Sequence, residues 1–238
     1  MKKGMKYRTF VLAILLCIPL TSWAEVTLRI AWDLNEPFSE LQALVKEGTA
    51  LQKKINPKVK HELWLDIVHG TGGGSASLLV YYEDFEHYAR AITRESASKA
   101  WNKFISSFPE NKFPTTFVGL SRTLVGGDLS ETTGGETLAI IAFDANESVA
   151  DFTELVSEAV RIQKQINPKA SIKLSASQIA GESVGGLAVL IRYPSMLDWA
   201  QGVAKLEASE DWREFLENFP ADKYPVVYQG LSQAGDIN

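Results

Sequence analysis

The sequence predicts an α+β protein in which two tandem ferredoxin-like repeats form an intrachain pseudo-dimeric α/β barrel. Residues 52–58 read Gln-Lys-Lys-Ile-Asn-Pro-Lys, and 163–169 repeat that motif with one change. The offset that carries Gln52 onto Gln163 also carries Trp101 onto Trp212, and the first copy aligns without a gap. Self-similarity at a fixed offset indicates a repeated structural unit. Within each copy the pattern reads strand, helix, strand, strand, helix, strand, the order of a ferredoxin-like unit.

Residues 1–24 have the layout of a secretory signal. Four basic residues precede an apolar run from Phe10 to Leu20, and small residues lie before the expected cleavage after Ala24. The apolar run is shorter than the roughly 20 residues of a spanning helix. We therefore expect a periplasmic or secreted mature chain without a membrane span. An uncleaved anchor is the alternative interpretation.

The remainder divides into three predicted parts. Residues 25–125 form the first repeat, 126–136 form a linker rich in Gly, Thr and acidic residues, and 137–238 form the second repeat. Each repeat has one helix-covered sheet face, and we expect the two other faces to pack against each other. Residues of the two repeats that are related by the fixed offset are called equivalent below.

Composition narrows the chemistry further. The single cysteine, Cys17, lies in the predicted signal, so disulfide and thiolate chemistry are excluded for the mature chain. A hydrophobic content of 45% permits a sizeable core. The net charge of −5 comes without a basic stripe, so nucleic acid is not an expected partner.

The first strand of each repeat is expected at 26–32 and 137–143. Asn35 and Asn146 follow these strands and are expected to cap the next helix, because asparagine accepts hydrogen bonds from free N–H groups there. In the first repeat this helix runs from about Pro37 to Ile55, with apolar residues at helical spacing.

The repeated Asn-Pro-Lys motif is expected to end each of these helices. Asn56 and Asn167 suit a left-handed cap, and proline cannot continue a helix. The motif resembles a functional signature, but its residue types are explained by helix termination.

Two strands joined by a glycine-rich turn follow in each repeat. In the first of them, 60–68, the side chains of Glu62, Trp64 and Asp66 share one face. The glycine runs lack the Gly-Lys-Ser/Thr ending of a phosphate-binding loop, so we interpret them as hairpin turns.

Each repeat then has a helical region, 85–108 or 196–219, broken where Ser98 and Ser209 can cap a second segment. The aromatic stripe in that segment, which includes Trp101 and Trp212, is expected to lie in the core.

These helical regions, especially Asp198-Trp199-Ala200 through Trp212-Arg213-Glu214-Phe215-Leu216, resemble the last helices of the dimeric α/β-barrel superfamily. That superfamily includes antibiotic-biosynthesis-type monooxygenases and NIPSNAP-like proteins. The shared motifs are packing motifs, so the resemblance bears on fold more than on chemistry. It implies two further readings, a cofactor-independent oxygenase or isomerase and a haem protein with a histidine ligand.

The histidines do not favour haem or another metal. His61, His69 and His87 all lie in the first repeat, and the equivalent residues of the second repeat are not histidines. His61 and His69 would be roughly 26 Å apart on a regular strand, too far to share a metal. We therefore expect no metal and no cofactor.

A ligand site needs a few polar groups in a mostly apolar pocket, which we expect between sheet and helices. The candidate ligand-binding residues are Trp64, His69, Tyr82, Arg192 and Tyr193. Tyr81 and Asp66 could also contribute. Only Tyr82 and Tyr193 correspond between the repeats, so one copy could have kept a site that the other lost. No catalytic residue can be assigned, and no Gly-Xaa-Ser-Xaa-Gly elbow is present.

The sequence thus favours an exported protein that binds a small apolar molecule or a protein partner. The alternative is a cofactor-independent monooxygenase or isomerase of the superfamily. A cavity holding His69, Tyr82 or Arg192 would favour a ligand or a substrate, whereas a filled interior would favour a role in protein interaction.

Overall fold

The computed structural model describes residues 25–69, 76–126, 134–179 and 186–237. The predicted signal, most of both glycine-rich turns and most of the predicted linker lie outside the described residues. Two successive series of elements have the same order: strand, helix, strand, strand, two helices, strand.

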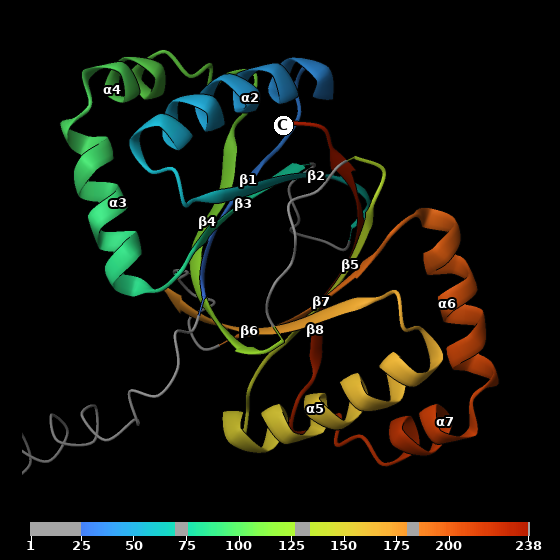
Figure 1. Ribbon diagram of the computed structural model, residues 1–238. Coiled ribbons are helices and arrows are strands. Elements are labelled where there is room, and N and C mark those ends of the chain that lie inside the picture. Colours follow the sequence, from blue (N-terminus) through green and yellow to red (C-terminus); the bar gives the residue numbers. More distant parts are fainter. Residues whose placement is uncertain (1–24, 70–75, 127–133, 180–185, 238) are drawn as a thin grey trace, which may run out of the picture.

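The first series comprises β1 (Val26–Trp32), α2 (Phe38–Ile55), β2 (Lys60–His69), β3 (Ala76–Tyr82), α3 (Phe85–Ala97), α4 (Lys99–Ser106) and β4 (Thr115–Val125). The second comprises β5 (Thr137–Phe143), α5 (Val149–Ile166), β6 (Ser171–Ile179), β7 (Leu187–Tyr193), α6 (Met196–Ala208), α7 (Glu210–Glu217) and β8 (Val226–Gly235). Helices of the first series cover one side of the barrel, and those of the second cover the opposite side (Figure 1).

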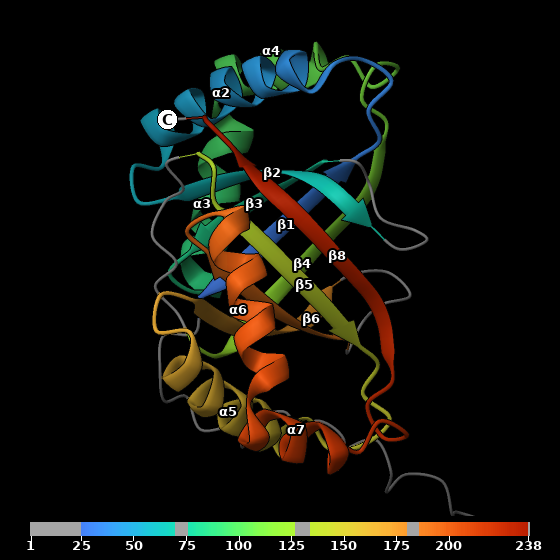
Figure 2. The ribbon, with the colours of Figure 1, turned by 90° about the vertical axis from the view of Figure 1, so that its right-hand side faces the viewer.

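The strands form a closed antiparallel barrel in the order β1-β3-β2-β8-β5-β7-β6-β4. The last strand of each series joins the two halves, because β4 pairs with both β1 and β6, and β8 pairs with both β5 and β2. Figure 2 shows β8 running diagonally across the barrel beside β5. The two sheets therefore join edge to edge, and their inner faces also meet across the interior as expected. Closure pairs the edges that two separate sheets would leave open.

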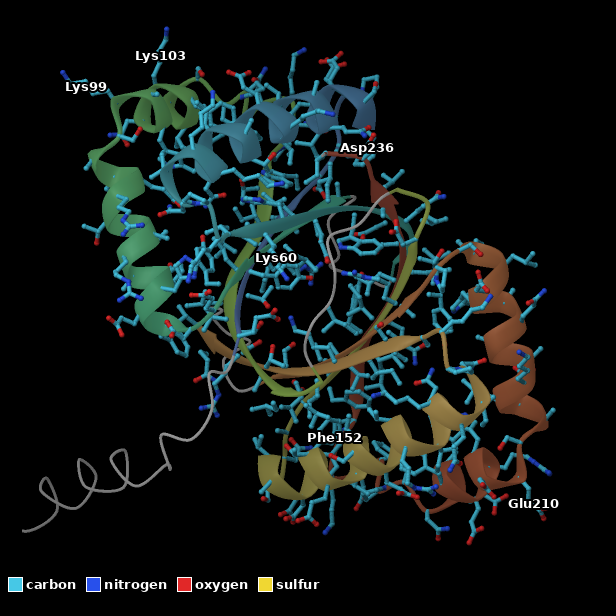
Figure 3. All side chains as sticks on the ribbon, in the orientation of Figure 1. Lys60, Lys99, Lys103, Phe152, Glu210 and Asp236 are labelled. Atoms are coloured by element: carbon cyan, nitrogen blue, oxygen red, sulfur yellow. The ribbon has the colours of Figure 1, made fainter. Side chains whose placement is uncertain are left out.

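Alternation along the strands separates an outer core from the barrel interior. Beneath α5, Phe152 packs on Phe143 and Tyr224, with ring centroids 5.0 and 4.7 Å apart. Figure 3 shows Phe152 between α5 and the barrel. A separate buried cluster fills part of the interior and comprises Trp64, Leu79, Tyr81, Leu138, Ile140 and Leu190.

The predicted caps are confirmed at the second helices and wrong at the first. Ser98 and Ser209 accept hydrogen bonds from the backbone N–H groups of Trp101 and Trp212, each at 3.3 Å. Ser148, not Asn146, caps α5, and Pro37 immediately precedes α2. Asn35 and Asn146 instead donate to backbone carbonyls of the loops that precede β4 and β8.

The Asn-Pro-Lys motif does end the first helix of each series, but without the expected left-handed cap. The φ angles of Asn56 and Asn167 are −134° and −127°. The Asn56 side chain donates to Oε1 of Glu95 at 2.8 Å, and that of Asn167 donates to the Gly202 carbonyl at 3.2 Å. Each asparagine therefore ties the first helix of its series to the second.

The aromatic stripes of α4 and α7 are not in the core, contrary to expectation. Both helices are fully described, and neither contains a buried residue. Trp212 is half-buried and stacks on Phe215 at 5.3 Å, whereas Leu216 is 52% exposed. These short helices lie at the outer edge of the helical layer (Figure 1), so their rings pack mainly within that layer.

None of the helices in the described ranges combines the length and apolar character needed to cross a membrane.

Candidate functional site

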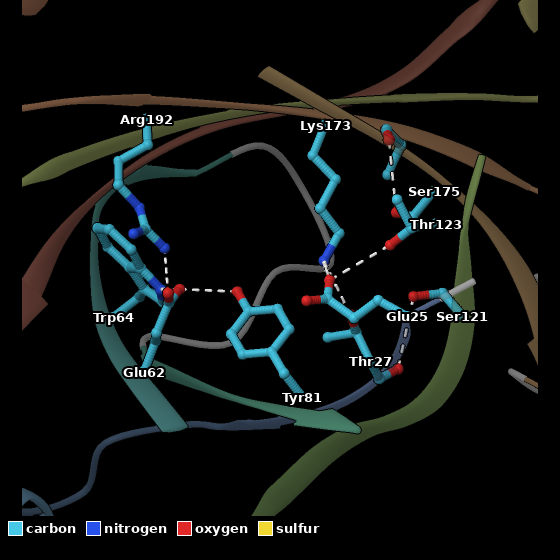
Figure 4. A network of polar contacts seen from close by, with 11 residues as sticks. Glu25, Thr27, Glu62, Trp64, Tyr81, Ser121, Thr123, Lys173, Ser175 and Arg192 are labelled. Atoms are coloured by element: carbon cyan, nitrogen blue, oxygen red, sulfur yellow. Dashed lines mark hydrogen bonds and ion pairs between the residues drawn. The ribbon is translucent and has the colours of Figure 1, made fainter. Parts of the chain in front are cut away.

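A buried ion pair lies inside the barrel on the β2 and β7 walls (Figure 4). The carboxylate of Glu62 pairs with the Arg192 guanidinium. It also accepts hydrogen bonds from the Tyr81 hydroxyl at 2.7 Å and from Nε1 of Trp64 at 3.2 Å. The Arg192 guanidinium lies 5.5 Å from the centroid of the Trp64 ring. Burial and the Glu62 charge raise the pKa of Tyr81 well above its usual range, so this hydroxyl remains a donor.

A second ion pair joins β6 to the start of the first series. Nζ of Lys173 lies 2.5 Å from Oε1 of Glu25 and donates to the Thr27 hydroxyl at 3.0 Å. The same ammonium lies 4.4 Å from the centroid of the Tyr81 ring, which separates the two pairs (Figure 4). Burial lowers the pKa of Lys173, and Glu25 opposes that shift. The two pairs and the residues that hydrogen-bond to them form the interior polar network.

A cavity of about 420 Å³ lies within the barrel next to this network. Its lining comes from both halves of the chain: Thr27, Arg29, Leu79, Phe117, Gly119, Leu120, Ser121, Ile140, Ala142, Phe143, Asp144, Lys173, Ser175, Ser177, Gly186, Leu187, Ala188, Leu190, Val227 and Tyr228. The cavity is therefore lined mainly by residues of the strands, whereas we expected a pocket between a sheet and its helices. Barrel closure creates a space that neither series could form alone.

Arg29 of β1 is the charged side chain on one wall of this cavity. Its Nε and Nη2 donate to the Ser77 hydroxyl at 3.3 and 3.2 Å. Its guanidinium lies 5.3 Å from the centroid of the Phe117 ring. The nearby Tyr228 hydroxyl is buried and has no partner in hydrogen-bond geometry among the described residues. Burial and the negative charge of Asp66 raise the pKa of Tyr228, whereas the neighbouring Arg29 guanidinium lowers it.

The structure separates the residues that the sequence suggested for a ligand site. Trp64 and Arg192 meet in the interior polar network. Tyr82 and Tyr193 lie on the helix-facing side of the barrel wall, where they accept hydrogen bonds from Gln52 at 3.3 Å and Gln163 at 2.9 Å.

His69 ends β2, and its side chain lies outside the described residues. None of the other four candidates lines the cavity. Their role in ligand binding remains a prediction.

Sequence reasoning missed Arg29, Glu62 and Lys173 as site residues. The sequence does contain a pattern that points to these residues. Lys173 is the equivalent of Glu62 in the second repeat, and Arg192 is the equivalent of Tyr81, so charged or polar residues recur at equivalent strand positions. Charged residues on predicted strands of both repeats indicate that the inward faces are not wholly apolar. The pairing of each charge, however, depends on how the barrel closes.

No protein-family model matches the sequence. A search of curated proteins also finds no match. Solved structures do match. A candidate monooxygenase from Fusobacterium nucleatum subsp. nucleatum ATCC 25586 superposes with a TM-score of 0.63 at 7% identity, over 92% of this chain and 94% of that one.

Two further solved structures also match. Chlorite dismutase from Candidatus Nitrospira defluvii, in a mutant form, has a TM-score of 0.51 at 11% identity, over 92% and 94% of the two chains. A heme-binding protein from Thermus thermophilus has the same TM-score and identity, over 90% and 92%. Together with the candidate monooxygenases, these similarities show that the chain has the dimeric α/β-barrel fold. At such low identities they define the fold alone.

Because one of these similar structures is a heme-binding protein, we ask whether the described residues could bind haem in the barrel cavity. His61 is fully buried, and its Nε2 lies 2.5 Å from Oε1 of Gln52. Nδ1 of His87 accepts the backbone N–H of Glu83 at 3.1 Å. Neither histidine lines the barrel cavity, whose lining contains no imidazole or thiol among the described residues. The described residues thus do not fit a histidine-ligated haem in this cavity, and the described ranges contain no cluster of three or more His, Cys, Asp or Glu suited to a metal.

Proposed function

We propose that this protein binds a small, largely apolar molecule inside its barrel. The observation that carries the proposal is the cavity of about 420 Å³, which falls in the range of roughly 300–1,000 Å³ typical of ligand pockets. Leu79, Ile140 and Leu190 line it together with a small number of polar side chains. Such a lining buries an apolar ligand body and orients it through a few polar contacts.

We further propose that the barrel is a fusion of two ferredoxin-like repeats in an exported chain. The fixed offset between the copies and the repeated element order support the fusion. The basic head, the apolar run and the small residues before Glu25 support export to the periplasm or secretion. Cleavage after Ala24 would make Glu25, which pairs with Lys173, the first residue of the mature protein.

A cofactor-independent monooxygenase or isomerase is the second candidate. The similarity in fold to candidate monooxygenases favours it. Lys173 also places a buried amine with a lowered pKa at the cavity wall, where it could exchange a proton with a bound substrate. Conversion of the bound molecule by the purified protein would support this candidate, and recovery of that molecule unchanged would support binding alone.

Native mass spectrometry of the protein purified from its own host tests the proposal. We expect an added mass on the folded chain, released on denaturation, and a denatured chain that begins at Glu25. The Ile140→Trp variant should lose the added mass because the indole would occupy the cavity. Val149→Trp, on the exposed face of α5, should keep it. A folded wild-type chain without added mass, or an Ile140→Trp variant that retains it, would contradict the proposal.

A further inference from the structure

Arg29 differs from the other described cations that face the barrel interior near the cavity. Lys173 is paired with Glu25, and Arg192 is paired with Glu62. Arg29 has no carboxylate within ion-pair distance among the described residues; it contacts the Ser77 hydroxyl and the Phe117 ring and lies near the Tyr228 hydroxyl. A charge held away from bulk water is costly unless an opposite charge accompanies it. Arg29 therefore has unused capacity for an anion.

The donor geometry supports the same conclusion. A guanidinium has five N–H donors, and Ser77 occupies only donors on Nε and Nη2. The remaining donors can bind both oxygens of a carboxylate, for which the planar guanidinium is well shaped. The Tyr228 hydroxyl, buried beside Gly230 and near Arg29, has a proton that it can donate to such an oxygen.

Part of the wall contributed by the second series is apolar, although Lys173, Ser175 and Ser177 of β6 also line the cavity. Ile140 and Ala188 both line the cavity, and they are the equivalents of Arg29 and Ser77 in the second repeat. The cavity thus presents an Arg29 charge that no described carboxylate pairs, the Lys173–Glu25 ion pair and an apolar patch that includes Ile140. The acidic residue in its lining, Asp144, is exposed and lies just beyond the end of β5. A ligand with its anionic end at Arg29 can place its apolar part against Ile140.

We infer that the bound molecule is a carboxylate with an apolar body, and that Arg29 binds the carboxylate. This inference rests on the proposed function and adds the chemical class of the ligand. It also assigns a role in specificity to a residue that forms no other ion pair in the described part of the chain.

The test compares octanoate with 1-octanol by isothermal titration calorimetry at neutral pH. Octanoate should bind about 10- to 100-fold more tightly than 1-octanol, the ratio expected for hydrogen bonds to a charged group. Arg29→Met should reduce the affinity for octanoate to about that for 1-octanol and so abolish this ratio. Arg29→Lys, which keeps the positive charge, should retain part of the preference for octanoate. Arg161→Met removes an exposed arginine that pairs with Glu158 and serves as the matched control.

The outcomes separate the inference from the proposed function. Equal affinity for the two probes, or unchanged octanoate binding by Arg29→Met, would overturn the carboxylate assignment; loss of both probes in Ile140→Trp would still support the cavity as the binding site. If neither probe binds the wild-type chain, the carboxylate assignment fails. An added mass in the host-purified protein would then preserve the proposed function, and the lack of one would reject it as well.

Discussion

His61 is a buried polar residue that the second half of the chain does not share. On the outer face of β2, its Nε2 lies 2.5 Å from the amide oxygen of Gln52. The amide nitrogen of Gln52 donates to Oε1 of Glu95 at 2.8 Å. Because an amide oxygen only accepts, Nε2 carries the proton and Nδ1 is unprotonated. Burial, with a smaller contribution from Lys53, lowers the pKa of His61 to about 3.

This pKa predicts a loss of stability in mild acid. As pH falls below the usual histidine pKa of about 6.5, the unfolded chain binds a proton at His61 that the folded chain does not, so the free energy of unfolding decreases. From pH 8 to pH 5 the loss attributable to His61 should be about 2 kcal/mol. Urea denaturation at both pH values, on wild type and on His61→Ile, measures it.

The variant carries the residue type found at the equivalent position of the second repeat, Ile172. Between pH 8 and pH 5, the free energy of unfolding of this variant should fall by about 2 kcal/mol less than that of the wild type. The comparison also cancels most of the opposite effect of Glu95, whose pKa burial raises. Parallel pH profiles for the two proteins would contradict a neutral buried imidazole.

At the scale of elements, helices α5 and α7 of the second series contribute differently to stability. α5 places Phe152 in a cluster with Phe143 and Tyr224 against the barrel wall. α7 contains no buried residue, and its Trp212 is half-buried. The burial of an aromatic ring, not its presence at helical spacing, determines how much apolar surface it removes from water.

Truncation of these two rings should therefore have unequal effects. Phe152→Ala should reduce the free energy of unfolding by about 3–5 kcal/mol, the usual cost of removing a core aromatic. Trp212→Ala should cost roughly half as much, because part of the indole already contacts water. Urea denaturation of both variants measures the difference. A larger loss for Trp212→Ala would mean that α7 packs more tightly than the structure shows.

At the scale of the whole molecule, the junctions β4–β6 and β8–β2 hold the two halves together. Gly126 follows β4 at one junction with a φ angle of 76°, and a Cβ there would lie 2.2 Å from the Ile172 carbonyl oxygen. Gly135 has a similar φ of 88° but has no atom within 4 Å of a built Cβ. Substitution of Gly135 therefore measures backbone strain alone, whereas substitution of Gly126 measures backbone strain together with a clash at the barrel junction.

Gly135→Ala should cost about 1–2 kcal/mol from the left-handed conformation alone. Gly126→Ala should cost at least about twice that, because the β4 and β6 backbones must also separate. Thermal unfolding of the two variants provides the comparison. Equal losses would show that the junction yields easily and that closure adds little to stability.

Much of the fold could be predicted from local patterns. Alternating apolar residues located β1, and a more uniformly apolar run at the equivalent position located β5. Serine before a polar turn located the caps at Ser98 and Ser209. Asn35 and Asn146 were assigned wrongly as caps because the same side chain suits a helix start or a loop carbonyl. Trp101 and Trp212 were assigned to the core because periodicity identifies a face of a helix but not what lies against it.

The sequence by itself determined the duplication, the element order and the alternation that turns Glu62, Trp64, Arg29 and Lys173 to one face of their strands. Only the tertiary structure decided that this face encloses a cavity, that Arg192 meets Glu62, and that Arg29 remains without a carboxylate partner in the described chain. The physical reason is that alternation is a local property of an extended backbone. Charge pairing depends on the register of strands far apart in the sequence, which is set where β4 and β8 cross between the two halves.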